Sequence, residues 1–220
     1  MTFLHTLTRR QFLAASVGTA AAILMPGMAL ASTRAEKLAE AQAYAEMYGP
    51  LPHEKFPIPA VDLRHIDPVY LRRFGDYKTS EIPGTVIVDT HKHVLFLVLP
   101  KGKAIRYGVG LGRAGFEWSG RAIIQYKREW PTWTPPAEMI AREPELEEWR
   151  NGMPPRLDNP LGARALYIFQ NGRDTLYRLH GSGDPASIGK SVSSGCVRLL
   201  HHDVIDLHNR VANKSPIVVI

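Results

Sequence analysis

The residues best suited to chemistry lie near the C-terminal end of the chain, between His180 and Arg198. Cys196 is the single cysteine in 220 residues, so an intramolecular disulfide is impossible. A cysteine attacks as its thiolate, and an imidazole within hydrogen-bond reach can take the thiol proton. His180 precedes Cys196 by sixteen residues. A buried, inert cysteine remains the alternative, because a Cys and a His at this spacing occur in many chains.

Several features around this pair would suit an acyl-transfer site. Backbone N–H groups near Gly195 and Cys196 could stabilise an oxyanion. Glycines in the intervening loop would let it fold back, and we expect them at hinges or at close backbone approaches. These glycines are Gly181, Gly183, Gly189 and Gly195.

The same stretch resembles the catalytic signature of the L,D-transpeptidases, the YkuD-domain family. That signature joins a His-Gly-[Ser/Thr] strand end, an Ile-Gly step and a Ser-x-Gly-Cys-[Ile/Val]-Arg loop. The matching segments here are HGS at 180–182, IG at 188–189 and SSGCVR at 193–198. The resemblance runs from about Gly84 to Ile220 and also includes IPGT at 82–85, WPTWTPP at 130–136 and NPLG at 159–162.

The resemblance implies a role for each matching residue. Cys196 would be the nucleophile, His180 would accept and then return a proton, and the main-chain carbonyl at Gly181 would orient the imidazole. Arg198 would either bind a substrate carboxylate or hydrogen-bond to loop carbonyls, and both alternatives remain open. Many family members carry His at the position of Ser194, which cannot act as a base.

Three further residues are candidates for lining the substrate site. Ser194 and Gly195 belong to the loop before the nucleophile, where we expect Ser194 to hydrogen-bond the turn. Trp133 stands among prolines and is expected to shape a groove between segments 113–136 and 182–195. Complete burial of Trp133 in the core is the alternative.

The activity that the resemblance implies is cross-linking of peptidoglycan. The enzyme would form a thioester with a stem peptide, release a terminal D-amino acid and pass the acyl group to an amine. No cofactor and no metal is implied, and carbapenem-type inhibitors are expected to bind. Three alternatives stay open: an L,D-carboxypeptidase, a ligase that attaches a protein to the wall, and a non-catalytic wall-binding module.

The first thirty-one residues are typical of an export signal. Residues 1–11 lack acidic side chains, an apolar run spans 12–25, and Ala29-Leu30-Ala31 offers a small-residue cleavage site. The apolar run is shorter than the roughly 20 residues that span a bilayer. Arg9-Arg10 resembles the twin-arginine export motif. We therefore expect a periplasmic protein without stable membrane insertion after cleavage; an uncleaved anchor is the alternative.

Behind this signal (1–31), we expect an N-terminal helix and Pro-rich linker (32–83) and then a catalytic domain (84–220). The helix is predicted over 34–48. Short apolar runs between turn signals predict a mainly β domain, a sandwich or barrel of the L,D-transpeptidase type with few short helices. The expected strands are 85–89, 93–99, 103–110, 121–127, 163–169, 175–180 and 217–220. A late helix is expected at 202–212, with Val204, Leu207 and Val211 on one face.

Other candidates favour structural explanations. The net charge of +6 comes without a basic run, so nucleic acid is not an expected partner. His91-x-His93 has no evident third metal ligand, and we expect these histidines at the surface. In His201-His202-Asp203, adjacent residues point away from each other on a helix, and Asp203 would favour the helix dipole. Segment 142–148 reads as a solvated surface insertion.

Overall fold

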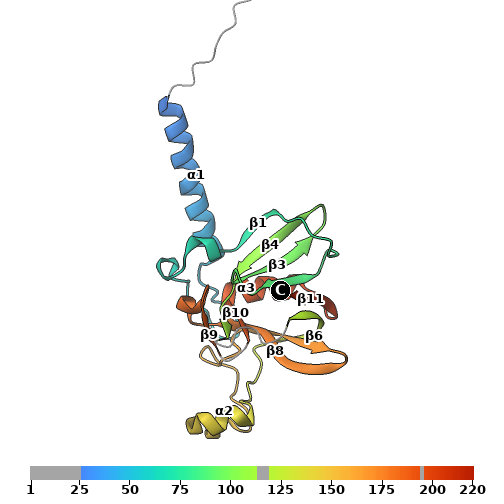
Figure 1. Ribbon diagram of the computed structural model, residues 1–220. Helices are drawn as coiled ribbons and strands as arrows, with labels where there is room; N and C mark the ends of the chain where they lie inside the picture. Colours follow the sequence, from blue (N-terminus) through green and yellow to red (C-terminus); the bar gives the residue numbers. More distant parts are fainter. Residues whose placement is uncertain (1–25, 113–118, 194–195) are drawn as a thin grey trace, which may run out of the picture. The chain divides into compact units, whose positions relative to one another are not determined.

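The computed structural model describes residues 26–112, 119–193 and 196–220 (Figure 1). Within them the helices are α1 (Pro26–Met47), α2 (Ala137–Arg142) and α3 (His201–Arg210), with 3-10 turns η1 (Leu63–His65), η2 (Pro68–Tyr70), η3 (Pro144–Trp149) and η4 (Pro185–Ser187). The strands are β1 (Arg73–Asp76), β2 (Val86–Asp89), β3 (Val94–Leu99), β4 (Lys103–Gly108), β5 (Leu111–Gly112), β6 (Gly120–Glu129), β7 (Arg164–Gln170), β8 (Arg173–Ser182), β9 (Ser191–Ser193), β10 (Val197–Leu200) and β11 (Ser215–Val219). The prediction of a mainly β protein with few short helices is confirmed.

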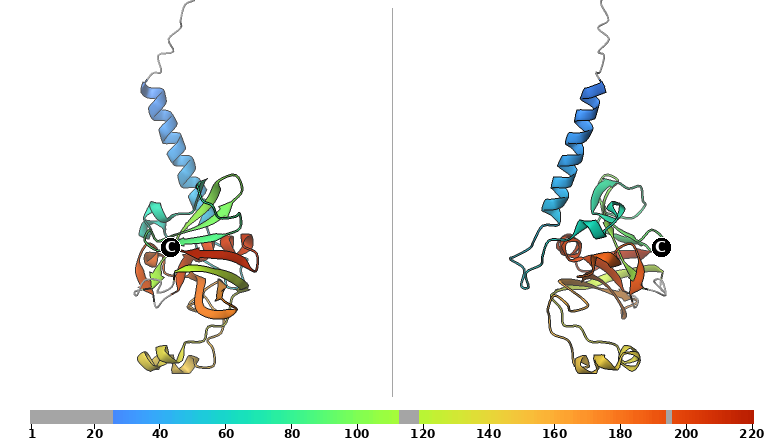
Figure 2. Two further views of the ribbon diagram at one scale, coloured as in Figure 1. Left: turned by 45° about the vertical axis from the view of Figure 1, so that its right-hand side comes forward. Right: turned by 90° about the vertical axis from the view of Figure 1, so that its left-hand side faces the viewer.

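Nine of the strands form one sheet in the order β1-β4-β3-β2-β11-β6-β7-β8-β10. Most neighbours are antiparallel, but β11 runs parallel to β2 and β10 runs parallel to β8. The C-terminal strand β11 therefore joins two antiparallel sets, β1–β4 and β6–β8, into one sheet, and lies between them (Figure 2, left). Strands β5 and β9 pair separately.

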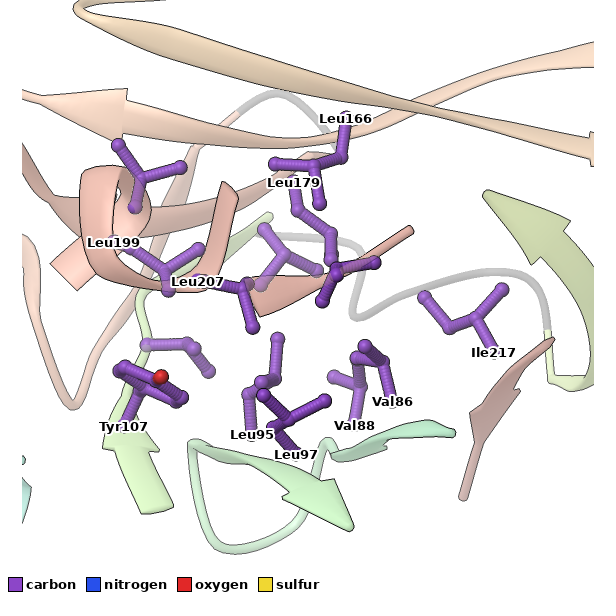
Figure 3. Close-up of a cluster of buried hydrophobic side chains, with 14 of the residues drawn as sticks. Val86, Val88, Leu95, Leu97, Tyr107, Leu166, Leu179, Leu199, Leu207 and Ile217 are labelled. Atoms are coloured by element: carbon purple, nitrogen blue, oxygen red, sulfur yellow. The ribbon is translucent and has the colours of Figure 1, made fainter. Parts of the chain in front are cut away.

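The sheet curls so that its two halves contribute to one apolar cluster, with α3 packed into it (Figure 3). Val86 and Leu95 come from one half, Leu166 comes from the other, and all three are fully buried. Leu207 of α3 lies among them. The predicted apolar face of this helix is confirmed, because Val204, Leu207 and Val211 all belong to the cluster.

Every predicted strand is present, and its ends differ from the expected ones by a few residues. The sequence did not reveal β1, which lies in the stretch predicted as a linker, the short strand β5, or β9 and β10, which flank the signature cysteine. These strands have two to four residues each, so their pattern alone is too short to show a period. Their pairing with distant strands stabilises them.

Helix α1 begins at Pro26 and not near residue 34 as predicted. Proline is tolerated in the first turn of a helix, because its missing N–H would have no partner inside the helix there. The chain divides into two compact units, Met1–Tyr44 and Ala45–Ile220. Arg9-Arg10 and the apolar run lie outside the described residues. Among the helices that are described, none has the length and apolar character needed to cross a bilayer.

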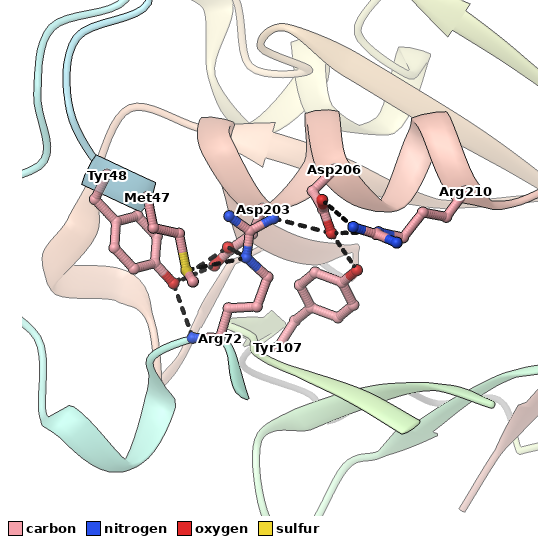
Figure 4. A network of polar contacts seen from close by, with 7 residues as sticks. All are labelled: Met47, Tyr48, Arg72, Tyr107, Asp203, Asp206 and Arg210. Carbon is pink, nitrogen blue, oxygen red and sulfur yellow. Dashed lines mark hydrogen bonds and ion pairs between the residues drawn. The ribbon is translucent and has the colours of Figure 1, made fainter. Parts of the chain in front are cut away.

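A buried polar network ties the segment before β1 to helix α3 (Figure 4). The Tyr48 hydroxyl donates to the Asp203 carboxylate at 3.2 Å and accepts the Arg72 N–H at 2.8 Å. The Arg72 guanidinium also lies 2.9 Å from Asp206, which accepts a bond from the Tyr107 hydroxyl. Asp203 lies in the first turn of α3, as expected for a residue that favours the helix dipole, and it also takes part in this network. Its side chain is fully buried, and that burial raises the pKa of Asp203 to about 7.

Candidate active site

The parallel pairing of β10 with β8 brings the segment that begins with Cys196 alongside the strand that carries His180. Arg198 of β10 pairs with His180 of β8, and Cys196 comes directly before β10. Since side chains alternate along a strand, Cys196 and Arg198 face the same side as His180. Val197 and Leu199 face the opposite side and are buried in the apolar cluster. The fifteen residues between His180 and Cys196 therefore return the cysteine to the strand that carries the histidine.

His180 is held in one orientation by the main chain that follows it. Its Nδ1 lies 2.9 Å from the carbonyl oxygen of Gly181, and the residue is 5% exposed. A carbonyl can only accept, so Nδ1 carries the proton and Nε2 keeps its lone pair. Burial lowers the pKa of His180 to about 4, against the opposing effect of the Gly181 carbonyl. The imidazole is therefore neutral at pH 7 and available as a base.

Gly181 is needed because neighbouring groups fill the space that a side chain would occupy. A Cβ at this position would come within 2.6 Å of Nδ1 of His201 and 3.1 Å of a Val204 methyl. The Gly181 N–H also donates to the carbonyl of Leu161 at 3.1 Å. Gly162, in the left-handed conformation at φ +60, approaches the Gly181 carbonyl from the same side. This packing fixes the peptide whose carbonyl orients His180.

The Cys196 sulfur lies against a strand segment that sequence reasoning did not single out. The side chain is half-buried, and its Sγ is 3.9 Å from the main-chain carbonyl of Leu176. Burial raises the pKa of the Cys196 thiol, while the backbone N–H of Arg178 and the charges of Arg178 and Arg198 act in the opposite direction. At neutral pH both the thiol and the imidazole are therefore uncharged. Such a pair suits general-base activation during attack and not a preformed ion pair.

The other predicted site residues differ in where the structure places them. Ser194 and Gly195 lie outside the described residues. The strand register places Arg198 beside His180 and on the same face of the sheet. Trp133 is half-buried and packs against a small cluster formed by Leu161, Ala165 and Tyr167, while Trp130 is almost fully buried.

Trp133 is therefore neither fully exposed nor buried in the main core. Ala165 pairs with His180 across the sheet, so the cluster that Trp133 joins continues the face on which His180 lies. This placement is compatible with the predicted groove wall, of which residues 113–118 lie outside the described part.

The glycines of the signature loop also differ from one another. Gly189 adopts φ +79, and a Cβ there would meet the Tyr70 ring at 2.2 Å. Gly183 has no atom closer than 3.6 Å to such a Cβ, so the close approach that we expected there is absent. Tyr70 also packs on Gly108 and thereby connects the loop to the end of β4.

The remaining histidines have structural contacts. His91 is exposed and His93 is half-buried, so the predicted surface position of this pair is confirmed; Nε2 of His93 lies 3.0 Å from the Ser191 hydroxyl. His202 contacts the carbonyl of Gly49 at 2.6 Å, and His201 packs on Gly181. Among residues 26–112, 119–193 and 196–220, no group of three or more His, Cys, Asp or Glu side chains is arranged to hold a metal ion.

The sequence predicted a strand over 175–180 but did not indicate that Arg178, within this strand, lies beside the site. Arg178 and His180 share a face of β8, and Tyr167 of β7 pairs with Arg178 on that face. The Arg178 guanidinium carbon lies 4.3 Å from the centre of the Tyr167 ring. The strand period of two would have placed Arg178 beside the site once His180 was assigned to a strand.

Comparison with known proteins establishes the family of this chain. Residues 83–219 match the model of the L,D-transpeptidase catalytic domain, YkuD. The chain belongs to the YkuD family of L,D-transpeptidase catalytic domains. Probable L,D-transpeptidase YcfS of Escherichia coli K12 is 31% identical over 168 residues, which cover 70% of this chain and 52% of that protein. Probable L,D-transpeptidase YbiS of the same strain is 36% identical over 140 residues, which cover 59% and 44%.

A solved structure extends the comparison of the YkuD domain. A Brucella melitensis protein described as a probable carnitine operon oxidoreductase is 43% identical, with a TM-score of 0.50, over 69% of this chain and 94% of that one. Its description names a different activity from that of the curated relatives. The chain spans about half the length of those relatives.

Proposed function

We propose that this YkuD domain is a peptidoglycan L,D-transpeptidase that works through a thioester on Cys196. The observation that carries the proposal is the return of Cys196 to the face of β8 on which His180 is held by the Gly181 carbonyl. A nucleophile, a base and a group that orients the base are the parts that acyl transfer requires. Family membership supports peptidoglycan as the substrate class, and the proposed acyl donor is a stem peptide of the wall.

In the first half-reaction, Nε2 of His180 takes the proton from Sγ as the sulfur attacks the carbonyl carbon before the terminal D-amino acid. The S–C bond forms and the C–N bond breaks. His180 returns the proton to the departing amine, and a thioester remains on Cys196. Since the thiol and the imidazole are both neutral at rest, the proton moves during attack.

In the second half-reaction, an amine from a neighbouring stem attacks the thioester. His180 takes a proton from this amine and gives it to the leaving sulfur, which restores both groups. Water would give a carboxypeptidase in the same step. An amine prevails only where the groove orients it and restricts water, which can supply several kcal/mol. The half-buried Trp133 next to the His180 face supports such a groove.

Purified protein and tetrapeptide muropeptides test this function. We expect release of D-Ala together with a dimer joined between two diamino-acid residues, both detected by mass spectrometry. Cys196→Ser should abolish turnover, and His180→Ala should slow acylation by roughly 10²–10⁴. Accumulation of tripeptide without dimer at high acceptor concentration would instead identify a carboxypeptidase. Attachment of a protein amine would identify a ligase.

A carbapenem provides a second test that does not need the natural acceptor. We expect one covalent adduct, on Cys196, in the intact-protein mass spectrum. No adduct, or an adduct on another residue, would argue against the proposed nucleophile and would favour a non-catalytic wall-binding module.

We also propose that the protein is exported to the periplasm by the twin-arginine route and cleaved near Ser32. The support is the sequence of residues 1–31, with Arg9-Arg10 before a short apolar run. Replacement of both arginines by lysine should block export. N-terminal sequencing of the exported form should begin near Ser32, and an intact N-terminus on a membrane-bound form would contradict cleavage.

A further inference from the structure

Strand β8 carries an irregularity directly beside the proposed nucleophile. Asp174 pairs with Phe169 of β7, and Arg178 pairs with Tyr167. Three residues of β8 therefore oppose the single residue Ile168 of β7, so the strand bulges between Asp174 and Arg178. Bulges of this kind often lie next to active sites, where they redirect main-chain or side-chain groups. We call residues 174–178 the β8 bulge.

The β8 bulge has an unusual backbone. Leu176, at its centre, adopts φ +62, a left-handed conformation that is strained for a residue with a branched side chain. Its side chain is 69% exposed, so burial of apolar surface does not compensate for this strain. Strained residues of this kind persist where surrounding contacts impose them, and they concentrate at functional sites.

Polar contacts of its own residues hold the β8 bulge in this shape. Oδ1 of Asp174 accepts the Leu176 N–H at 2.8 Å. The Thr175 hydroxyl donates to the carbonyl of Ile168 at 2.7 Å and accepts the Tyr177 N–H at 3.2 Å. The side chains of Asp174 and Arg178 form a two-point ion pair, with both N–O distances 2.7 Å.

The ion pair between Asp174 and Arg178 is anchored to the sheet through the Arg178 side chain. The Arg178 side chain is 12% exposed and lies over the Tyr167 ring, which in turn stacks on Tyr126 with 4.4 Å between ring centres. One guanidinium N–H also donates to the carbonyl of Tyr177 at 2.9 Å. A planar guanidinium held by a carboxylate, a carbonyl and an aromatic face has little freedom to move.

The shape of the β8 bulge turns two main-chain groups toward Cys196. The Leu176 carbonyl lies 3.9 Å from Sγ. A backbone hydrogen bond from Arg178 acts on the same sulfur and lowers the pKa of the thiol. The carbonyl can accept from the thiol, and the N–H can donate to the thiolate. The sulfur thus has a suitable partner both before and after it loses its proton.

We infer that the β8 bulge positions and activates the nucleophile: the Asp174, Thr175 and Arg178 contacts hold the Leu176 carbonyl and the Arg178 N–H against Sγ of Cys196. Asp174, Thr175 and Arg178 act as positioning residues. The inference rests on the proposed role of Cys196, but it concerns the chemistry of the thiol and not the identity of the substrate.

Alkylation of the thiol by iodoacetamide tests this inference without any peptidoglycan substrate. The rate follows the thiolate fraction, so its pH dependence gives the thiol pKa, and the single cysteine makes the signal unambiguous. The charged groups that act on the sulfur are Arg178 on β8 and Arg198 on β10, with Asp174 paired to Arg178. The titratable imidazole of His180, which is neutral at pH 7, lies on the same face of β8 as Arg178.

Thr175→Val removes the hydroxyl contacts without changing any charge. If the β8 bulge holds the Arg178 N–H on the sulfur, the alkylation midpoint should rise by about one pH unit, which slows the reaction roughly tenfold below the midpoint. Asp174→Ala provides an independent test with an opposite electrostatic expectation. Loss of a nearby negative charge alone would lower the midpoint, whereas release of the bulge should raise it.

Glu147→Ala is the matched control, because Glu147 makes a similar two-point pair with Arg150 in the exposed 3-10 turn η3. Its midpoint should equal that of the parent protein. Circular dichroism establishes that each variant is folded; if Thr175→Val does not fold, Asp174→Ala decides. An unchanged midpoint in folded Thr175→Val, or a lowered one in Asp174→Ala, overturns the inference. If both variants raise the alkylation midpoint but the parent protein does not turn over muropeptides, the inference is supported and the proposed function is refuted.

Discussion

Replacing Gly181 by alanine should disable the proposed base without touching its side chain. A Cβ at this position would lie 2.6 Å from Nδ1 of His201, 3.1 Å from Val204 and 3.2 Å from the backbone nitrogen of Ala163. None of these groups is the free end of a flexible side chain, since His201 and Val204 are buried on α3. To reach an ordinary contact distance of 3.4 Å from His201, the peptide must move by about 0.8 Å.

Such a movement acts directly on the imidazole. The Gly181 carbonyl that would move is 2.9 Å from Nδ1 of His180, and a similar increase in that distance would end the hydrogen bond. A displacement of about 1 Å at a reacting group can cost about 100-fold in rate. Overpacking of the buried site should also lower the free energy of unfolding by about 1–3 kcal/mol.

The assay is the rate of carbapenem acylation of Cys196, followed by intact-protein mass spectrometry, together with denaturant unfolding. Gly183→Ala is the matched control, because an added Cβ there meets nothing closer than 3.6 Å. It should acylate at the parent rate. An acylation rate of folded Gly181→Ala within about threefold of the parent rate would show that the Gly181 carbonyl has no role in orienting His180.

Three further outcomes follow from the same structure. Burial lowers the pKa of His180 to about 4, so the rate of carbapenem acylation should stay high as the pH falls through 6.5 and should decline only near pH 4. A series of acylation reactions at different pH, quenched at fixed times and analysed by mass spectrometry, measures this. Gly189→Ala should lower the free energy of unfolding, because φ at this position is +79 and the Tyr70 ring fills the space that a Cβ would occupy. Combining it with Tyr70→Ala in the same chain should recover part of this loss, as measured by denaturant unfolding. Burial raises the pKa of Asp203 to about 7, so the folded state binds more protons than the unfolded state between about pH 4 and 7. The parent should therefore lose stability relative to Asp203→Asn as the pH rises through that window, and equal differences at pH 5 and pH 8 would contradict this.

The sequence by itself indicated the family and most of the strands and helices. The signature around His180 and Cys196 is a local pattern, and it led to the family that residues 83–219 match. The longer strands and the apolar face of α3 were predicted because alternation and helical spacing are properties of consecutive residues. The catalytic roles of Cys196, His180 and Gly181 remain predictions that the proposed assays address.

The tertiary structure alone decided how these residues meet. The pairing of β10 with β8, the close approach of Gly162 and His201 to Gly181, and the contact of Tyr48 with Asp203 all join segments that are distant in the sequence. The β8 bulge is a mismatch between two strands, so neither strand shows it alone. Local propensity says which residues form a strand. Which backbone group faces Sγ depends on register and on packing between strands, which arise only once the sheet has formed.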